Sequence, residues 1–349
     1  MLACSMMIFL VLSSMSGVLI VVHPYLRNQS SHYEVEVDCG LAEYLLLDPG
    51  DPANWGSQTD TSLMRFGLAK SGFTTPFELD IDKVARLNQE SAYHVSLLDV
   101  FKTLSVQDKP LKVSIRPLLD VTLDLASKTD EGDETIYRFN VYTKKSNSPM
   151  ASSLRCYTVL GDYVVNTTSS TSTLGVGTVD VSLPNSLNGT ALLITLAKIE
   201  PRIVSYGIYS FKHDTGDEPY PLGTFVRLSP LNYMLRVELQ YLTEEISSAK
   251  VFTYNYSFNL ATVTKSTGIE QYSIPQLQDV SPMVLVVTGF NQSISFAEWV
   301  TYPPLPLDFG SDFMEKHDPM NSLSLHFLVN INSALYECEI TLGEQGDDA

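Results

Sequence analysis

The apolar residues divide the chain into a short N-terminal stretch and a long body. The first 22 residues form one apolar run without a charged side chain (1–22). As a helix that rises ~1.5 Å per residue, this run would be about 33 Å long, close to the thickness of a bilayer core. A cleaved signal peptide has a shorter apolar centre of roughly 7–15 residues. We therefore expect residues 1–22 to be a retained transmembrane anchor.

A helical period continues beyond this run. Pro24 interrupts the pattern, which then resumes and ends at the turn sequence 48–50, since Pro and Gly do not extend a helix. One apolar face is formed by residues spaced three or four apart, namely Val35, Cys39, Ala42 and Leu46. The spacing predicts an amphipathic helix over 23–47 that runs from the membrane into the body.

Residues 48–117 combine turn, helix and strand patterns. A turn-rich loop with Trp55 comes first, and Asp80 then stands where a helix over 81–88 would need its N-cap. Tyr93, Leu97, Phe101 and Leu104 form an apolar stripe at helical spacing. Alternating residues over 111–116 predict a half-buried strand. We interpret 48–117 as a small α+β region.

From residue 118 onward the apolar period is near two. The expected strands of the first stretch include residues 121–125, 137–141, 154–158, 179–183, 191–199 and 203–211. About seven short strands in about 95 residues are typical of an immunoglobulin-like sandwich. We therefore assign residues 118–212 to such a β-sandwich.

A second β region covers residues 213–349. Its expected strands are 233–241, 251–258, 283–287, 323–331 and 335–342. The sequence leaves two arrangements open: residues 32–117 form a separate domain, or they pack with the strands near 323–342 and make the sandwich an insertion. The predicted class is thus mainly β, with an N-terminal transmembrane helix, a small α+β region, a sandwich and a second β domain.

Composition and charge exclude some partners. The net charge of −18 is unfavourable for nucleic acid and for an anionic lipid surface, whereas it suits a solvated extracellular body. Cys4 lies in the apolar run, and Cys39, Cys156 and Cys338 show no disulfide or zinc spacing. We expect Cys39 on a helix and the other two on strands.

Candidate chemistry is sparse. The six histidines show no metal-ligand spacing, and no nucleophile, zinc or phosphate-loop motif occurs. Asp214-Thr215-Gly216 is similar to the aspartic protease tripeptide, but that chemistry needs a second copy, so we interpret it as a turn. Asp130 with Asp133, and Asp214 with Asp217, lack EF-hand spacing and are interpreted likewise. We therefore expect no enzyme, no catalytic or metal site and no cofactor.

Five Asn-x-Ser/Thr sequons follow the apolar run, mostly beside expected loops. They are Asn28, Asn166, Asn188, Asn255 and Asn291. Since such asparagines accept glycans in exported proteins, we predict these five as glycosylation sites on an exported body.

The arrangement resembles archaeal pilin-like surface proteins, which are related in plan to type IV pilins. The matching parts are the apolar stem, its helical continuation, the loop Pro49-Gly50-Asp51-Pro52-Ala53-Asn54-Trp55-Gly56, the sequence Phe66-Gly67-Leu68-Ala69 and the sandwich, over roughly residues 1–212. The chain departs from the pattern because no basic leader precedes the stem and no glutamate begins it. The resemblance implies a surface protein that contacts similar subunits through its N-terminal helix.

Two hypotheses about function follow. The first is a non-enzymatic, single-pass membrane protein with an extracellular body, acting as a pilin-like structural or assembly component. The alternative is an anchored adhesin or ligand-binding ectodomain, which predicts an apolar or aromatic pocket at a domain junction.

Overall fold

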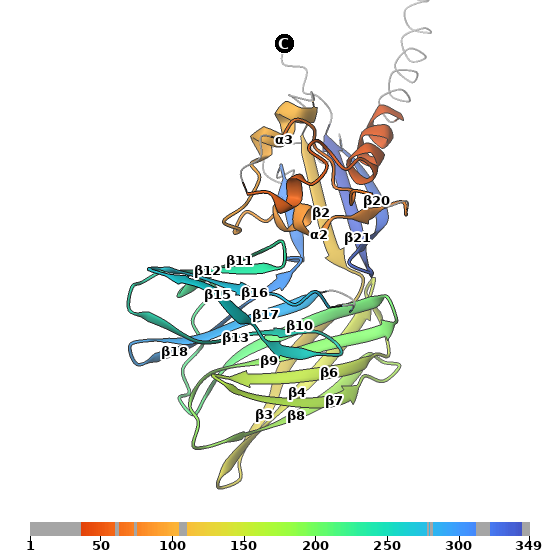
Figure 1. Cartoon of the computed structure of the whole chain (residues 1–349). Helices are drawn as coiled ribbons and strands as arrows, with labels where there is room; N and C mark the ends of the chain where they lie inside the picture. Colours follow the sequence, from red (N-terminus) through yellow and green to blue (C-terminus); the bar gives the residue numbers. More distant parts are fainter. Residues whose placement is uncertain are drawn as a thin grey trace, which may run out of the picture.

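The protein is mainly β and consists of a small α+β domain and two β-sandwiches (Figure 1). We call the α+β domain the proximal domain, because the described chain starts in it. The computed structural model describes residues 36–59, 63–72, 75–104, 110–277, 279, 282–311 and 322–343. The predicted anchor (1–22) and the start of the predicted 23–47 helix lie outside these ranges. Within them, no helix has the length and apolar character needed to span a membrane.

The proximal domain is built from both ends of the described chain. A helix covers residues 36–47, and η1 (Trp55–Ser57), α2 (Ile81–Ala85) and α3 (Leu97–Leu104) follow it. One five-stranded sheet has the order β1-β20-β21-β2-β19. Its strands are β1 (Glu78–Leu79), β2 (Leu111–Pro117), β19 (Leu307–Gly310), β20 (Ser322–Ile331) and β21 (Ala334–Gly343).

Strand β2 joins the two ends of the chain in this sheet. It pairs antiparallel with β21, from Leu111 opposite Leu342 to Pro117 opposite Tyr336, and with β19 on its other side. The sequence had left two arrangements open, and this pairing corresponds to the one in which the strands near 323–342 pack with the N-terminal region. The sandwiches are therefore inserted between the two halves of the proximal domain.

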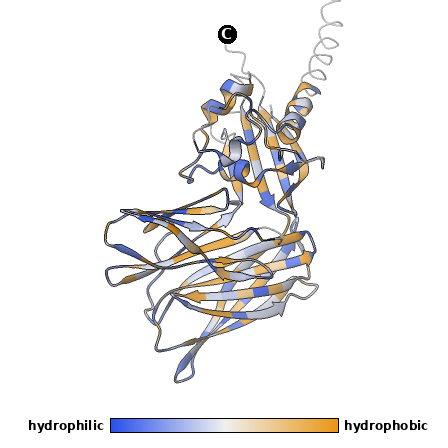
Figure 2. Ribbon diagram, in the orientation of Figure 1, coloured by the Kyte–Doolittle hydropathy of each residue, from blue (hydrophilic) through white to orange (hydrophobic). Residues whose placement is uncertain are grey.

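Apolar residues of the helix and the sheet fill the proximal core. Ala42, Leu45 and Leu46 of the helix are fully buried, and Cys39 is half-buried, as the helical spacing predicts. Ala42, Leu45 and Leu46 belong to the same cluster as Val113 and the other inward residues of the sheet. The alternation of hydropathy along the strands is visible in Figure 2.

Sandwich 1 comprises β3 to β10. One sheet contains β3, β4, β5 and β8, and the other has the order β10-β9-β6-β7. The strands are β3 (Asp120–Asp130), β4 (Glu134–Lys145), β5 (Ser148–Pro149), β6 (Ser153–Leu160), β7 (Tyr163–Ser170), β8 (Val176–Pro184), β9 (Gly189–Glu200) and β10 (Ile203–His213). An aromatic group that includes Tyr137, Phe139 and Phe211 occupies its core.

Sandwich 2 comprises β11 to β18 in two four-stranded sheets, with the orders β11-β12-β16-β15 and β14-β13-β17-β18. The strands are β11 (Val226–Leu231), β12 (Met234–Leu239), β13 (Glu244–Phe252), β14 (Ser257–Asn259), β15 (Ala261–Ser266), β16 (Ile269–Ser273), β17 (Met283–Asn291) and β18 (Ile294–Tyr302). Its own core includes Leu235, Val251 and Leu285.

The two sandwiches pack face to face and make a stack of four sheets (Figure 1). A fourth apolar cluster fills the space between the two inner sheets, with Tyr157 and Ile194 from sandwich 1 and Phe252 and Val286 from sandwich 2. The helix 36–47 lies at the end of the proximal domain away from the sandwiches (Figure 1).

The structure corrects several details of the sequence prediction. The expected 213–349 domain is divided, because β19, β20 and β21 bury their apolar faces in the proximal core. The expected strand 251–258 is broken by a turn in which the amide of Thr253 donates to the carbonyl of Tyr256. Helix α2 ends near Ala85, although Asp80 caps it as predicted. Helix α3 starts at Leu97, so Tyr93 precedes it.

Candidate functional site

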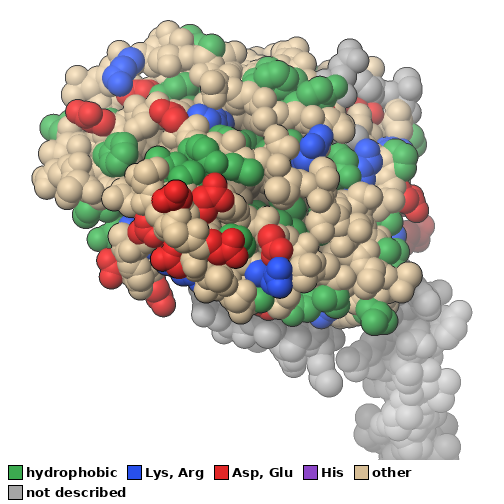
Figure 3. All heavy atoms as spheres, turned by 90° about the horizontal axis from the view of Figure 1, so that it is seen from below, with side chains coloured by type: hydrophobic (Ala, Val, Ile, Leu, Met, Phe, Trp, Pro, Cys, Tyr) green, Lys and Arg blue, Asp and Glu red, His purple; other side chains and the backbone are tan. Residues whose placement is uncertain are grey.

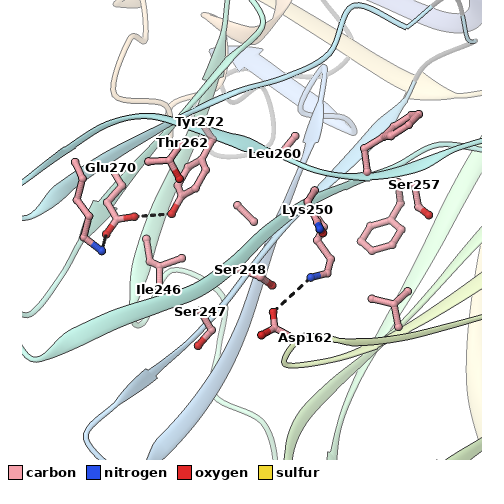
Figure 4. Close-up of a pocket in the computed structure, with 16 residues that line it drawn as sticks. Asp162, Ile246, Ser247, Ser248, Lys250, Ser257, Leu260, Thr262, Glu270 and Tyr272 are labelled. Atoms are coloured by element: carbon pink, nitrogen blue, oxygen red, sulfur yellow. Dashed lines mark hydrogen bonds and ion pairs between the residues drawn. The ribbon is translucent and has the colours of Figure 1, made fainter.

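A groove of about 860 Å³ opens where sandwich 2 meets sandwich 1 (Figure 4). Its floor is the edge of β13, from Ile246 to Ala249. Asp162 and Val164, at the β6–β7 turn of sandwich 1, line one side. Strands β15 and β16 of the opposite sheet of sandwich 2 line the other side. The groove therefore has a strand edge at its base and one sandwich on each flank.

Hydroxyl groups join the floor of the groove to sandwich 1. The Ser248 hydroxyl lies 2.9 Å from that of Thr288 on β17, which donates to the carbonyl of Gly161 in the β6–β7 turn at 3.3 Å. Tyr157 also donates to the carbonyl of Thr253 at 3.2 Å. These bonds hold the floor of the groove and its sandwich 1 flank in a defined relation.

A buried cation reaches the groove on the sandwich 1 side. The side chain of Lys250 is only 10% exposed, and its Nζ lies 3.5 Å from Oδ1 of Asp162, which is 74% exposed. Neighbouring Ala249 and Val251 belong to the core of sandwich 2, so strand alternation turns Lys250 toward sandwich 1. A buried ammonium with one long, exposed ion pair can accept a further anionic partner at low desolvation cost.

A buried anion reaches the groove on the opposite side. Glu270 on β16 is 5% exposed and pairs at 2.6 Å with Lys265, which is 66% exposed. Its other oxygen accepts a hydrogen bond from the Tyr272 hydroxyl at 2.5 Å. Burial and this bond to Glu270 raise the pKa of the Tyr272 hydroxyl, so it remains a donor at neutral pH. Figure 4 shows this pair apart from Lys250 and Asp162.

Aromatic side chains mark the rim. The rings of Tyr256 and Phe258 stack with centroids 5.9 Å apart, and both side chains are exposed. Phe258 also lines the groove. Such a pair offers an apolar surface at little conformational cost. The site thus combines hydroxyls, one buried charge of each sign and an aromatic rim, which are groups suited to binding.

The surface of the sandwich end is rich in acidic groups. Figure 3 looks onto this end from below and shows Asp and Glu side chains gathered in the middle of the face, with few Lys and Arg among them. This distribution agrees with the net charge of −18. It would repel a polyanion and leaves the two lysines of the groove as uncommon cationic groups.

The loop that carries the pilin resemblance has a structural role. The indole of Trp55 donates to the carbonyl of Gly67 at 2.9 Å, and Nζ of Lys83 donates to the carbonyls of Pro49 and Ala69, both at 2.7 Å. Burial lowers the pKa of Lys83 to about 8. Gly67 is required here, since a Cβ at this position would lie 2.2 Å from the carbonyl oxygen of Asp48.

The other residues singled out from the sequence do not form a site. Asp214 lies in a turn with a positive φ of 68°, 3.6 Å from the ring of His213. In the part of the chain that the structure describes, no three His, Cys, Asp or Glu side chains come together as metal ligands would. The thiols of Cys39, Cys156 and Cys338 are free, and burial raises the pKa of Cys156 to about 11 and that of Cys338 to about 12.

The predicted glycosylation sites differ in their surroundings. Asn166 on β7 and Asn188 in a turn are exposed. Asn255 is exposed as well, but its Nδ2 donates to Asp279 at 2.8 Å. Asn291 is half-buried and accepts a bond from Thr243. Asn28 lies outside the described residues, so glycosylation at all five positions stays a prediction.

Sequence reasoning did not find the groove residues. The alternative hypothesis expected an apolar or aromatic pocket at a domain junction, whereas this groove lies at such a junction but is lined mainly by polar groups. The available signal was Lys250 inside the otherwise apolar sequence Ala249-Lys250-Val251-Phe252. Glu270 gave no comparable signal, because residues 269–273 show no apolar period in the sequence, although burial alternates along this strand.

Comparison with known proteins assigns this chain to no family. No protein-family model matches the sequence, and no curated protein matches it. Similar solved structures include HBP35 of Porphyromonas gingivalis, with 12% identity over 53% of this chain and a TM-score of 0.20. A marsupial T cell receptor is similar with 9% identity over 52% of this chain and 96% of that chain, at a TM-score of 0.18. A chimeric titin Z1Z2-Z1Z2 tandem is similar with 8% identity over 52% of this chain and 97% of that chain, at a TM-score of 0.15.

The match spans 64% of HBP35, so it leaves part of that protein uncovered. TM-scores this low support no conclusion about function or site. The observed strand arrangement defines the class: a mainly β protein that contains immunoglobulin-like sandwiches.

Proposed function

We propose that this protein is a non-enzymatic, membrane-anchored extracellular protein that binds a partner in the groove between its two sandwiches. Residues 1–22 serve as the single-pass anchor, and the proximal domain connects this anchor to the sandwiches. The observation that carries the proposal is the pair of buried charges in the groove, Lys250 and Glu270, whose counter-ions are mostly exposed. A fold retains such groups at a cost in stability, and ligand recognition is one reason to retain them.

The position of the groove agrees with display on a surface. The helix 36–47 leaves the proximal domain on the side away from the sandwiches (Figure 1). A membrane at the N-terminal end would therefore leave the groove facing outward. The acidic surface supports a solvated, extracellular setting.

Site-specific photocrosslinking on intact cells tests this proposal. A photoreactive amino acid at Ser257, on the rim of the groove, should give a discrete crosslinked product. The matched control is the same amino acid at Thr178, an exposed position on the outer sheet of sandwich 1. Equal crosslinking from both positions, or none from Ser257, would contradict binding in the groove.

A second candidate function is a pilin-like structural subunit. It is favoured by the helix 36–47, which follows the apolar run in the sequence and packs on the proximal core with one face only. Adjacent copies would then bundle through residues 1–22, with close packing at small side chains. Shearing the cells and labelling the released material with antibody tests it: labelled filaments are expected, and a protein that stays wholly in the membrane fraction excludes it.

A further inference from the structure

Strand β13 has an edge that is only partly covered. On one side it pairs with β17 along most of its length, from Glu244 to Phe252. On the other side, among the described residues, β14 pairs only with Lys250–Phe252, and one further bond joins the amide of Leu260 to the carbonyl of Ala249. The segment 244–248 therefore has no strand beside it at the groove.

A bulge lies within this open segment. The register of β13 against β17 shifts between Ile246 and Ser248, so Ser247 is an extra residue outside the regular ladder. Ile246, Ser247 and Ser248 all line the groove. An open strand edge offers backbone donors and acceptors to any extended chain that can reach it. Here the two flanks restrict access to a single strand rather than to another sheet.

The two flanks match the alternation of a strand. Side chains of an added strand would point alternately toward sandwich 1, where Lys250 lies, and toward β16, where Glu270 lies. The side facing Lys250 favours a carboxylate, because its present partner Asp162 is 3.5 Å away and exposed. The side facing Glu270 favours a hydroxyl or basic side chain, because that carboxylate is buried with a single exposed cation.

We propose that the groove binds an extended peptide segment of a partner protein, which adds as a strand to the open edge of β13. The segment carries a carboxylate that faces Lys250, and it lacks proline at the positions that pair with β13. This inference rests on the proposed function and specifies its ligand. Main-chain bonds supply affinity in such strand addition, and the side pockets supply specificity.

Selection of peptides is the first part of the test. Random seven-residue peptides on phage are selected on the full chain in detergent and counter-selected on Ser248→Trp, whose indole would fill the groove. We expect an enriched, proline-poor sequence that carries a carboxylate for the Lys250 side and a hydroxyl or basic side chain for the Glu270 side. In Lys250→Met the affinity of this peptide should fall about tenfold, as for one lost charge-assisted bond, and Lys250→Arg should restore it. Failure to select any peptide, or equal affinity for Lys250→Met, would overturn the proposal.

Backbone methylation of the peptide is the second part, and it does not depend on how a protein variant folds. Alternate residues of a strand direct their N–H groups to the same neighbour. Two versions of the selected peptide, N-methylated at alternate residues in opposite phase, should therefore differ in affinity by about tenfold or more. Equal loss in both phases, or no loss in either, would contradict strand addition.

The two proposals fail in different ways. If Ser257 gives a specific crosslink on cells and no peptide is selected, the groove binds a partner of another class; the peptide inference is then wrong and the proposed function stands. If the crosslink and the peptides are both absent, both proposals are wrong.

Discussion

The two sandwiches share an architecture but differ in how their edges are closed. In sandwich 1 the two sheets approach each other at both edges, through β3 with β10 and β7 with β8. In sandwich 2, β15 is exposed along its whole length and β13 is uncovered over 244–248. Open edges carry a risk of aggregation, which Lys265 on β15 reduces. An open edge inside a groove with buried charges is consistent with the strand addition that we propose for β13.

The interiors of the two sandwiches also differ in polarity. Sandwich 1 has a core of packed aromatic rings. The ring centroid of Phe139 lies 5.4 Å from that of Tyr209 and 5.5 Å from that of Phe211. Sandwich 2 buries three carboxylates, those of Glu244, Glu270 and Glu298. We infer that sandwich 1 supplies rigidity and that sandwich 2 trades some stability for recognition.

The largest effect is expected in the core of sandwich 1. Phe139→Ala removes a fully buried ring from the aromatic group and should lower the unfolding free energy by about 3–5 kcal/mol. Urea denaturation monitored by tyrosine fluorescence would measure it. A loss below about 1 kcal/mol would mean that this core is not tightly packed, and the contrast with sandwich 2 would disappear.

The pH dependence should separate the two sandwiches. Burial raises the pKa of Glu244 and Glu298, so the folded state of sandwich 2 binds protons more tightly than the unfolded state. The resulting stabilisation is complete below the ordinary pKa of glutamate and is lost as the pH rises through the raised values. In sandwich 1, the bond from Arg138 lowers the pKa of Asp180, whose contribution is lost as the pH falls.

Hydrogen exchange at several pH values, corrected for intrinsic rates, would measure this difference. As the pH rises from acid to neutral, the amides of sandwich 2 should become less protected against exchange. The double variant Glu244→Gln/Glu298→Gln should flatten that trend. Asp180→Asn serves as the control, because it should change the stability of sandwich 1 only through the contribution that Asp180 loses as the pH falls. Parallel pH profiles for the two sandwiches would be inconsistent with a costly polar interior in sandwich 2.

A smaller effect is expected from the buried lysine of the groove. Lys250→Met removes a desolvated ammonium and leaves Asp162 in solvent, so the unfolding free energy should stay the same or rise by about 1 kcal/mol. Peptide affinity should fall in the same variant. Thermal unfolding and a binding titration give both quantities. A clear loss of stability would assign Lys250 a structural role instead.

The smallest stability effect is expected at the rim. Phe258 is 44% exposed, so Phe258→Ala should change the unfolding free energy by no more than about 0.5 kcal/mol while weakening binding severalfold. Leu174→Ala, on an exposed loop of sandwich 1, is the matched control for loss of surface apolar area. If both variants leave binding unchanged, the rim does not contact the ligand.

Local pattern predicted much of the fold. The alternation over 111–116 and 335–342 corresponds to β2 and β21, and Asp80 caps α2 as expected. Pairing between β2 and β21 could not be derived, because more than 200 residues separate them and no local signal records such contacts. Strand β15 was not predicted, since all its residues are exposed and leave no apolar period.

The candidate site was less accessible to sequence reasoning than the fold. Asp162, Lys250 and Glu270 come from β6–β7, β13 and β16, and only the packing of two sandwiches brings them to one groove. Asp162 and Glu270 have the pattern of ordinary surface charges, and Lys250 alone stands out, because its neighbours in the sequence are apolar. The sequence alone therefore indicated the kind of fold, a mainly β body, but not the position of the groove.

Hydrogen–deuterium exchange of β13, with and without the selected peptide, tests the central claim most directly. The account predicts that the peptide slows exchange over 244–249, while the amides of Lys250–Phe252, already beside β14, change little. Protection that falls on another surface, or a bound peptide that leaves 244–249 unchanged, would contradict strand addition at the open edge of sandwich 2.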